Sequence, residues 1–464
     1  MIHIAPLITA AAALIVQPVA DPRPDFSSQV PYREQLRRMH QERTGPNAYP
    51  ALLKAKALLD KVGEGLPPRD DDRGAWIQWS ALSDPSADAA ERGRAITALA
   101  MAREAGIDAV IAEVAGGRTV VRPMGETLII ADTLADPSAA RACVHINRAR
   151  MSEDAQAGRW DQWFERVRES LQIGRLYIHD EYMIMYLVGG ACVANALEAI
   201  DAAAASDGLG EKRLQAVAAM LDSAVPLPRP QDCFEGSRIA IKAAVEYVYE
   251  RNSFQRLAAV VQEGEAFPSD AGQPAAATPP IEGWLTKAQA LAQVDELHDN
   301  AKRLAMLSFS QRRADPFKPA EFEQTISSKT NPVLAVSLPA VQKLLASVNQ
   351  VEVQSAGTKT IVALERYRLK HGFYPAATEA LLPEFLPALP IDPFTDKPLL
   401  YKAPAAEPHS GGRPYLLYSA GYDQSDNGGT TDPENRFTAF IPGRGAGLDF
   451  VLNPALTDQL PTGK

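Results

Sequence analysis

The feature that most constrains this chain is a helical periodicity of apolar residues that runs, with short interruptions, from about residue 46 to residue 330. Apolar side chains recur at three- and four-residue spacing, which places them on one face of a helix. The segments with this pattern are 50–62, 89–105, 137–157, 159–177, 182–204, 211–224 and 233–261. Short Gly- and Pro-rich breaks between long helices favour antiparallel hairpins. The periodicity therefore predicts a mainly α region, 46–330, of irregular antiparallel helical hairpins.

The N-terminal segment MIHIAPLITAAAALIVQPVA indicates export. No charged residue occurs from Ile4 to Val16. That apolar stretch is too short for a membrane span, which needs about 20 residues, but it is typical of a signal peptide. We therefore predict a signal peptide over 1–20, a polar linker over 21–45, and a periplasmic or extracellular protein. An uncleaved N-terminal anchor and a buried N-terminal helix are the alternatives.

Charge and motifs exclude several classes of function. The formal net charge of −10 argues against a general nucleic-acid binder, which needs Lys and Arg to neutralise phosphates. The chain contains no CxxC, HExxH, GxSxG or Walker A motif. The uncharged stretch 182–197 is short for a membrane span, so we expect a buried core helix there and no transmembrane helix in the mature chain.

Two short segments combine histidine with acidic residues. One is His179-Asp180-Glu181, and the other places Glu296 and Asp299 on either side of His298. Such a motif could supply half of a carboxylate–histidine metal site. Single occurrences are common by chance, and we expect exposed helix faces or helix ends at both places.

Residues 331–464 change character and predict a second domain, a long helix followed by a small α+β unit. The helix is expected to end at His371, because Gly372 can take a left-handed conformation and Pro375 cannot continue a helix. A short helix over 378–386 and strand-like runs rich in Leu and Tyr follow, with a last short strand expected over 449–452.

This C-terminal part resembles the soluble domain of the major pseudopilin of type II secretion. The resemblance covers about 355–430 and follows the order of that family's helix stop, turn, strand and Gly/Asp-rich loop. The matching residues are Tyr367, Arg368, Gly372, Tyr374, Pro375, Asp392, Pro393, Phe394, Tyr401, Leu417, Tyr418, Ser419, Gly421 and Asp423. The whole chain is also similar to uncharacterised secreted bacterial proteins that carry this module. The family's basic leader and processing site have no counterpart in residues 1–30, so its assembly function does not transfer with the fold.

The loop DQSDNGGTTDPE has the ligand spacing of a calcium site. Hard cations prefer oxygen ligands, and a glycine permits the sharp turn. The candidate ligands are Asp423, Ser425, Asp426, Asn427, Asp432 and Glu434. The pseudopilin resemblance also implies calcium in this loop. The alternative is a metal-free Asx/Gly turn, which the same residues form in water.

We therefore expect an exported, non-enzymatic structural or interaction protein with a calcium-stabilised, pseudopilin-like module and an unidentified protein partner. One alternative is an accessory component of a type II secretion or pilus-like assembly. Another is an enzyme of unknown class with its site in the helical region, which would require converging His, Asp and Glu side chains in a pocket.

Overall fold

The computed structural model describes residues 27–453, apart from gaps at 68–76, 85–86, 125–128, 130–135, 207, 226, 228–229, 231, 252–282, 327–329, 404–413, 433–434 and 442–443. The predicted signal peptide, 1–20, and the end of the predicted helix 233–261 lie outside the described residues.

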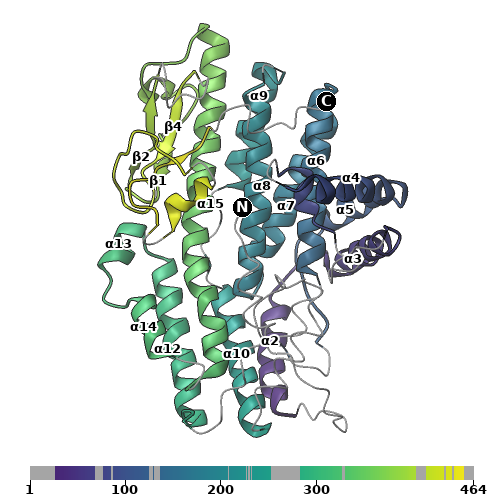
Figure 1. Ribbon diagram of the computed structural model, residues 1–464, viewed down its shortest axis with the longest axis vertical. Helices are drawn as coiled ribbons and strands as arrows, with labels where there is room; N and C mark the ends of the chain where they lie inside the picture. The colour runs from purple at the N-terminus through teal and green to yellow at the C-terminus, as the bar shows by residue number, and fades with distance from the viewer. Residues whose placement is uncertain are drawn as a thin grey trace.

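The described part of the chain is mainly helical, with a small antiparallel sheet region near its C-terminal end, as the sequence predicts (Figure 1). The helices are α2 (Val30–Gln41), α3 (Tyr49–Glu64), α4 (Ala89–Glu104), α5 (Ile107–Ala115), α6 (Pro137–Gln156), α7 (Trp160–Ile178), α8 (Met183–Ala204), α9 (Gly210–Ala224), α10 (Asp232–Arg251), α12 (Lys287–Ala305), α13 (Phe309–Ala314), α14 (Pro319–Thr325) and α15 (Pro332–His371). The predicted helical segments agree with these bounds to within a few residues wherever they are described.

The segment 21–45, predicted as a linker, contains a helix instead. Helix α2 begins with a proline in its first turn and buries only Arg33 and Leu36. A single buried leucine produces no apolar period, which is why the sequence pattern did not reveal this helix. Polar contacts with α10 and with the α7–α8 turn complete its packing.

Helices α7 and α8 form the tightest hairpin, and two glycines allow it. A Cβ atom on Gly174 would lie 3.0 Å from the Gly189 carbonyl oxygen and 2.6 Å from a methyl of Val193. A Cβ on Gly189 would in turn lie 2.6 Å from the Gly174 carbonyl oxygen. The two backbones therefore approach to a distance that no larger side chain permits.

The long helix α15 packs against the helical region on one side and against the sheet on the other (Figure 1). Gly190 of α8 faces Ser347, and Asp201 of α8 lies beside Thr358 further along, so α8 and α15 run parallel. On the other side, Gly357 lies against Leu452, which directly follows the last described strand. Helix α15 thus belongs to both parts of the fold.

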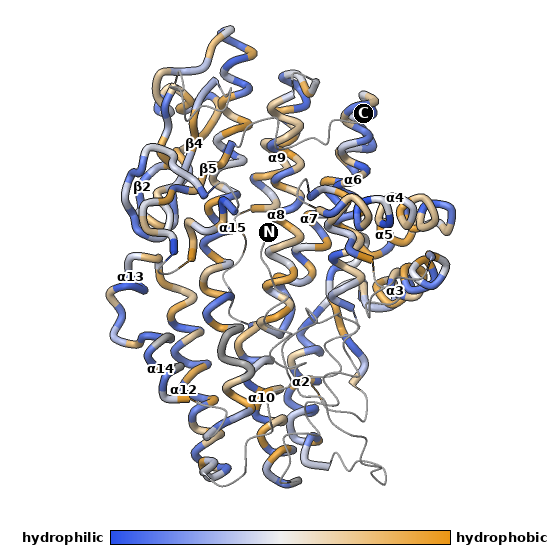
Figure 2. The backbone as a smooth tube through the Cα atoms, viewed as in Figure 1, coloured by the Kyte–Doolittle hydropathy of each residue, from blue (hydrophilic) through white to orange (hydrophobic). Residues whose placement is uncertain are grey.

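Helix α8 is the one described helix long and apolar enough to cross a membrane. Its apolar window is 72% buried inside the protein, and it contacts α6, α7 and α15. Figure 2 shows apolar residues along much of its length, next to those of its neighbours. These contacts fit the predicted buried core helix.

The C-terminal strands are short and antiparallel. One ladder joins β1 (Ile391–Asp392) to β2 (Lys397–Pro398), and a second sheet has the order β3 (Leu400–Lys402), β4 (Leu416–Ser419), β5 (Phe450–Val451).

The predicted helix 378–386 is only a 3₁₀ turn, Thr378–Leu381. Pro383 explains this correction, because a proline lacks the N–H that a continuing helix would need.

Two large apolar cores hold the described residues together, beside a small cluster of Leu416, Tyr418 and Val451. One joins α2–α6 to one face of α7, α8 and α10, and the other joins α7–α15 to the C-terminal strands. Val341 and Leu344 of α15 and Phe450 of β5 belong to the same core. Apolar packing is therefore continuous across the predicted domain boundary between residues 330 and 331.

Candidate functional site

The predicted calcium loop brings Asp423 and Asn427 together with a residue that the sequence analysis did not select, Asp449. The Asp423 carboxylate accepts hydrogen bonds from the backbone N–H of Ser425 (2.9 Å) and of Gly447 (2.7 Å). The Asn427 side-chain amide donates to Asp423 Oδ2 (3.3 Å), and its backbone N–H donates to Asp449 Oδ2 (3.0 Å). Asn427 therefore links the two carboxylates.

Asp449 is fully buried and incompletely satisfied. Its Oδ2 accepts from the N–H of Asn427 and of Gly429 (2.7 Å), whereas its Oδ1 has no hydrogen-bond partner among the described residues. Burial raises the pKa of Asp449 to about 6. A buried carboxylate oxygen without a donor is unfavourable unless a proton or a cation satisfies it.

The other predicted ligands have different partners. Asp426 accepts from the Tyr418 hydroxyl (2.8 Å) and lies 3.8 Å from Lys402 Nζ. Asp432 accepts from Asn435 N–H (3.3 Å) and the Thr438 hydroxyl (2.8 Å), at the start of a 3₁₀ turn. The Ser425 hydroxyl lies 3.4 Å from the Asp423 carbonyl oxygen.

The predicted ligand Glu434 lies outside the described residues. Among those that are described, no three His, Cys, Asp or Glu side chains are grouped as metal ligands would be. The loop nevertheless offers the carboxylates of Asp423 and Asp449. That oxygen-only donor set suits calcium, which also accepts backbone carbonyl oxygens and water.

The segment His179-Asp180-Glu181 is not the exposed helix end that we expected, because Asp180 and Glu181 are fully buried. They lie in the turn between α7 and α8, where Arg122 pairs with Asp180 and the residues His40 and Arg43 pair with Glu181. Arg122 donates to Asp180 Oδ2 (2.8 Å) and, through two nitrogens, to both oxygens of Asp136 (2.7 and 2.9 Å). The Tyr177 hydroxyl also donates to Asp136.

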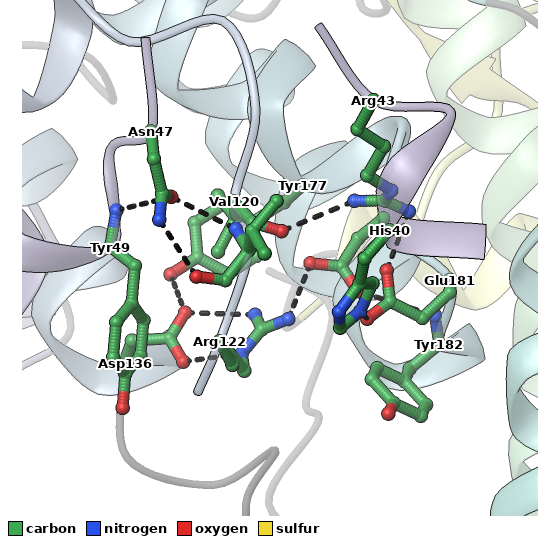
Figure 3. Close-up of polar contacts among 12 residues, drawn as sticks. His40, Arg43, Asn47, Tyr49, Val120, Arg122, Asp136, Tyr177, Glu181 and Tyr182 are labelled. Atoms are coloured by element: carbon green, nitrogen blue, oxygen red, sulfur yellow. Dashed lines mark hydrogen bonds and ion pairs between the residues drawn. The ribbon is translucent and has the colours of Figure 1, made fainter. Parts of the chain in front are cut away.

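Glu181 is bound from the other direction by the end of α2 (Figure 3). His40 Nε2 lies 2.8 Å from Glu181 Oε1, and Arg43 lies 2.5 Å from Oε2. Burial opposes ionisation of Glu181, but the bond to His40 and the charge of Arg43 lower its pKa overall. Burial raises the pKa of the neighbouring Asp180 to about 7, although Arg122 acts in the opposite direction.

We call these residues (His40, Arg43, Arg122, Asp136, Tyr177, Asp180 and Glu181) the buried charge cluster. Part of this cluster could have been predicted from the sequence, because two adjacent acidic residues between apolar helices require cationic partners when they are buried. No local pattern identifies Arg43 or Arg122 as those partners, since both come from distant segments.

The second acid–histidine segment lies beside a groove of about 790 Å³ between α2, α10 and α12. His298 is buried with Nδ1 2.7 Å from the Val294 carbonyl oxygen, and burial lowers its pKa to about 4. Asp299 pairs with Arg238 (2.9 Å) across the groove, whereas Glu296 is exposed. The three side chains therefore do not form one site.

No protein-family model matches this chain, and neither a curated protein nor a solved structure is significantly similar to it.

Proposed function

We propose that this chain is an exported, non-enzymatic binding or scaffolding protein whose pseudopilin-like C-terminal module is stabilised by calcium. The observation that carries the proposal is the unpartnered Oδ1 of the buried Asp449 beside the Asp423–Asn427 pair. A calcium ion held by Asp423 and Asp449 would satisfy this oxygen. It would also connect the loop after β4 to the segment leading into β5.

The test is calorimetric titration of the mature full-length chain with calcium chloride, together with thermal unfolding. The full chain is required because α15 belongs to both parts of the fold. Extracellular calcium modules typically bind with dissociation constants of about 10⁻⁴–10⁻³ M. At a hundredfold excess over that constant, ligand binding stabilises the folded state by about 2.7 kcal/mol, so the melting temperature should rise.

Matched variants distinguish this site from nonspecific binding. Asp423→Asn and Asp449→Asn should abolish both the heat and the thermal shift. Asp426→Asn, in the same loop, should retain both, because its carboxylate contacts Tyr418 and Lys402 instead. No heat and no shift at millimolar calcium, or equal binding by all three variants, would refute the calcium proposal.

Support for a binding role comes from the charged side chains of the groove. Arg238 pairs with Asp299, and Lys242 pairs with Asp295 (2.9 Å), so the groove's cations are neutralised by acidic neighbours. Hydrolytic activity that a substitution in the helical region abolishes would overturn this part of the proposal.

The accessory-component alternative rests on the pseudopilin resemblance alone. In this chain α15 contacts α8, α9 and α12 and the C-terminal strands, and most of its described side chains before its last turn are buried. A filament subunit needs an exposed helix for lateral packing, so we favour the scaffolding role. Co-purification of the full chain with pseudopilins would reverse that preference.

A further inference from the structure

The short helix α13 lies next to the C-terminal strands, close to β1 (Figure 1). Its first residue, Phe309, is buried, and its ring centre lies 4.8 Å from that of Phe394 and 5.2 Å from that of Tyr422. Just before the helix, the Ser308 hydroxyl donates weakly to the Asp396 carboxylate (3.4 Å). These contacts join the helical region to the C-terminal module through α13.

Gln424, which follows Asp423 in the loop, supplies further polar bonds to α13. Its side-chain oxygen accepts from Arg313 Nη1 (3.0 Å), and its side-chain nitrogen donates to the Ser310 hydroxyl oxygen (3.2 Å). The same nitrogen donates to the Phe394 carbonyl oxygen. Both N–H groups of this amide and its oxygen are therefore engaged outside the loop.

The backbone of Gln424 lies in the left-handed region, at φ +62°. Among the described residues, Gln424 and Asp396 are the two non-glycine residues with such a φ, and both contact α13. A glutamine rarely adopts this conformation, because its Cβ then lies too close to the following carbonyl oxygen. Such strain persists where surrounding contacts fix the residue. The contacts with α13 therefore account for the conformation of Gln424.

The conformation of Gln424 determines how the neighbouring Asp423 is placed. Asp423 directs its carboxylate into the loop, toward the N–H groups of Ser425 and Gly447. Gln424 directs its amide out of the loop, toward α13. A change of φ at Gln424 would rotate Asp423 relative to the rest of the loop, and so relative to Asp449.

We propose that Gln424 is a positioning residue for the calcium site, through which the docking of α13 sets the calcium affinity. This inference rests on the proposed function, because it concerns the same site. While α13 is docked, Gln424 stays left-handed and Asp423 and Asp449 keep their relative placement. When α13 leaves, that placement is lost. Coupling between two binding events is reciprocal, so bound calcium also stabilises the docked position of α13.

Calorimetric titration of the full-length chain with calcium chloride tests this with a variant that leaves every loop residue in place. Ser310→Ala/Arg313→Met removes both hydrogen bonds between α13 and Gln424. The dissociation constant for calcium should rise at least about fivefold. Charge alone predicts the opposite, because losing an arginine near a cation site removes a repulsion. Lys402→Met is the matched control, since it removes a cation 3.8 Å from Asp426 in the same loop and should not weaken binding.

Two substitutions at Gln424 separate the backbone from the side chain. Gln424→Ala loses the bonds to α13 and disfavours the left-handed φ, so it should weaken calcium binding at least as much as the α13 variant. Gln424→Gly loses the same bonds but takes this conformation without steric cost, so it should recover part of the affinity. Adding the α13 substitutions to Gln424→Gly should not change the dissociation constant further. A merely structural role would lower the calcium-free melting temperature and leave the dissociation constant unchanged.

Hydrogen–deuterium exchange provides a second readout. Calcium should slow exchange of the α13 amides at least about fivefold in the wild type, and less in Gln424→Gly. Helix α4, which belongs to the other core, is the internal reference. If the α13 variant does not fold, the comparison of Gln424→Ala with Gln424→Gly decides. A wild type that binds no calcium would overturn the proposed function together with this inference. Calcium binding with equal dissociation constants in the wild type, the α13 variant and Gln424→Ala would overturn this inference alone.

Discussion

Gly189 of α8 lies against Gly174 of α7 so closely that a Cβ on Gly189 would come 2.6 Å from the Gly174 carbonyl oxygen. Gly174→Ala should therefore force the two helices apart and lower the free energy of unfolding by about 1–3 kcal/mol, the usual effect of overpacking. Urea unfolding monitored by circular dichroism measures this. Gly93→Ala on α4 is the matched control, because nothing lies within 4 Å of its Cβ. The control should be neutral or stabilising, since alanine favours helix formation.

Arg122 is 4% exposed and pairs with two buried carboxylates, those of Asp136 and Asp180. Arg122→Met leaves both without their cation and should lower the free energy of unfolding by about 3–5 kcal/mol at pH 7. The comparison is Arg168→Met, which removes an exposed pair with Glu165 and should change stability by less than about 1 kcal/mol. Equal effects of the two substitutions would show that the buried charge cluster contributes no special stability.

Calcium binding should weaken in acid. The pKa of Asp449 is raised to about 6 by burial, so below that pH a proton competes with the metal for this carboxylate. We expect the dissociation constant to increase about tenfold between pH 7.5 and pH 5, measured by calorimetry. Asp426→Asn should show the same dependence. A constant that does not change over this range would exclude Asp449 as a ligand.

A fragment that contains only residues 331–464 should not fold alone. Val341, Leu344 and Val348 of α15 are buried in the core shared with the helical region. Exposing a leucine of this kind is unfavourable by about 1.5–3 kcal/mol. Circular dichroism and amide NMR of the fragment should show a largely unfolded chain. A cooperatively unfolding fragment would mean that the β-strand side of α15 suffices to stabilise it.

The features that could be predicted from the sequence are those that depend on neighbouring residues. The long helix ends as predicted, with Gly372 at φ +84° and its N–H donating to the Arg368 carbonyl oxygen. Periodicity also identified α6, α7, α8 and α9, because each carries an apolar face long enough to recognise. The short helix α2 has no such face and was mistaken for a linker.

Contacts between distant segments could not be predicted. Asp180 and Glu181 looked like a solvated helix end because their partners, Arg122 and Arg43, come from other parts of the chain. Asp449 was not recognised as a companion of Asp423 because the chain must return through the segment before β5 to place it there. The spacing of residues along a sequence can indicate a site within one loop, whereas each of these two sites is assembled from several segments of the chain.

The parallel packing of α8 and α15 has a consequence for the order of folding. Arg436, in the 3₁₀ helix Arg436–Phe440 between β4 and β5, binds Glu198 of α8 across 238 positions of sequence. Two helices that run in the same direction cannot be joined by a tight turn, so their contact forms only after a long intervening chain has been ordered. We therefore expect α7 and α8 to associate early as a local hairpin. The apolar face of α8 that later receives α15 stays uncovered until the last third of the polypeptide arrives.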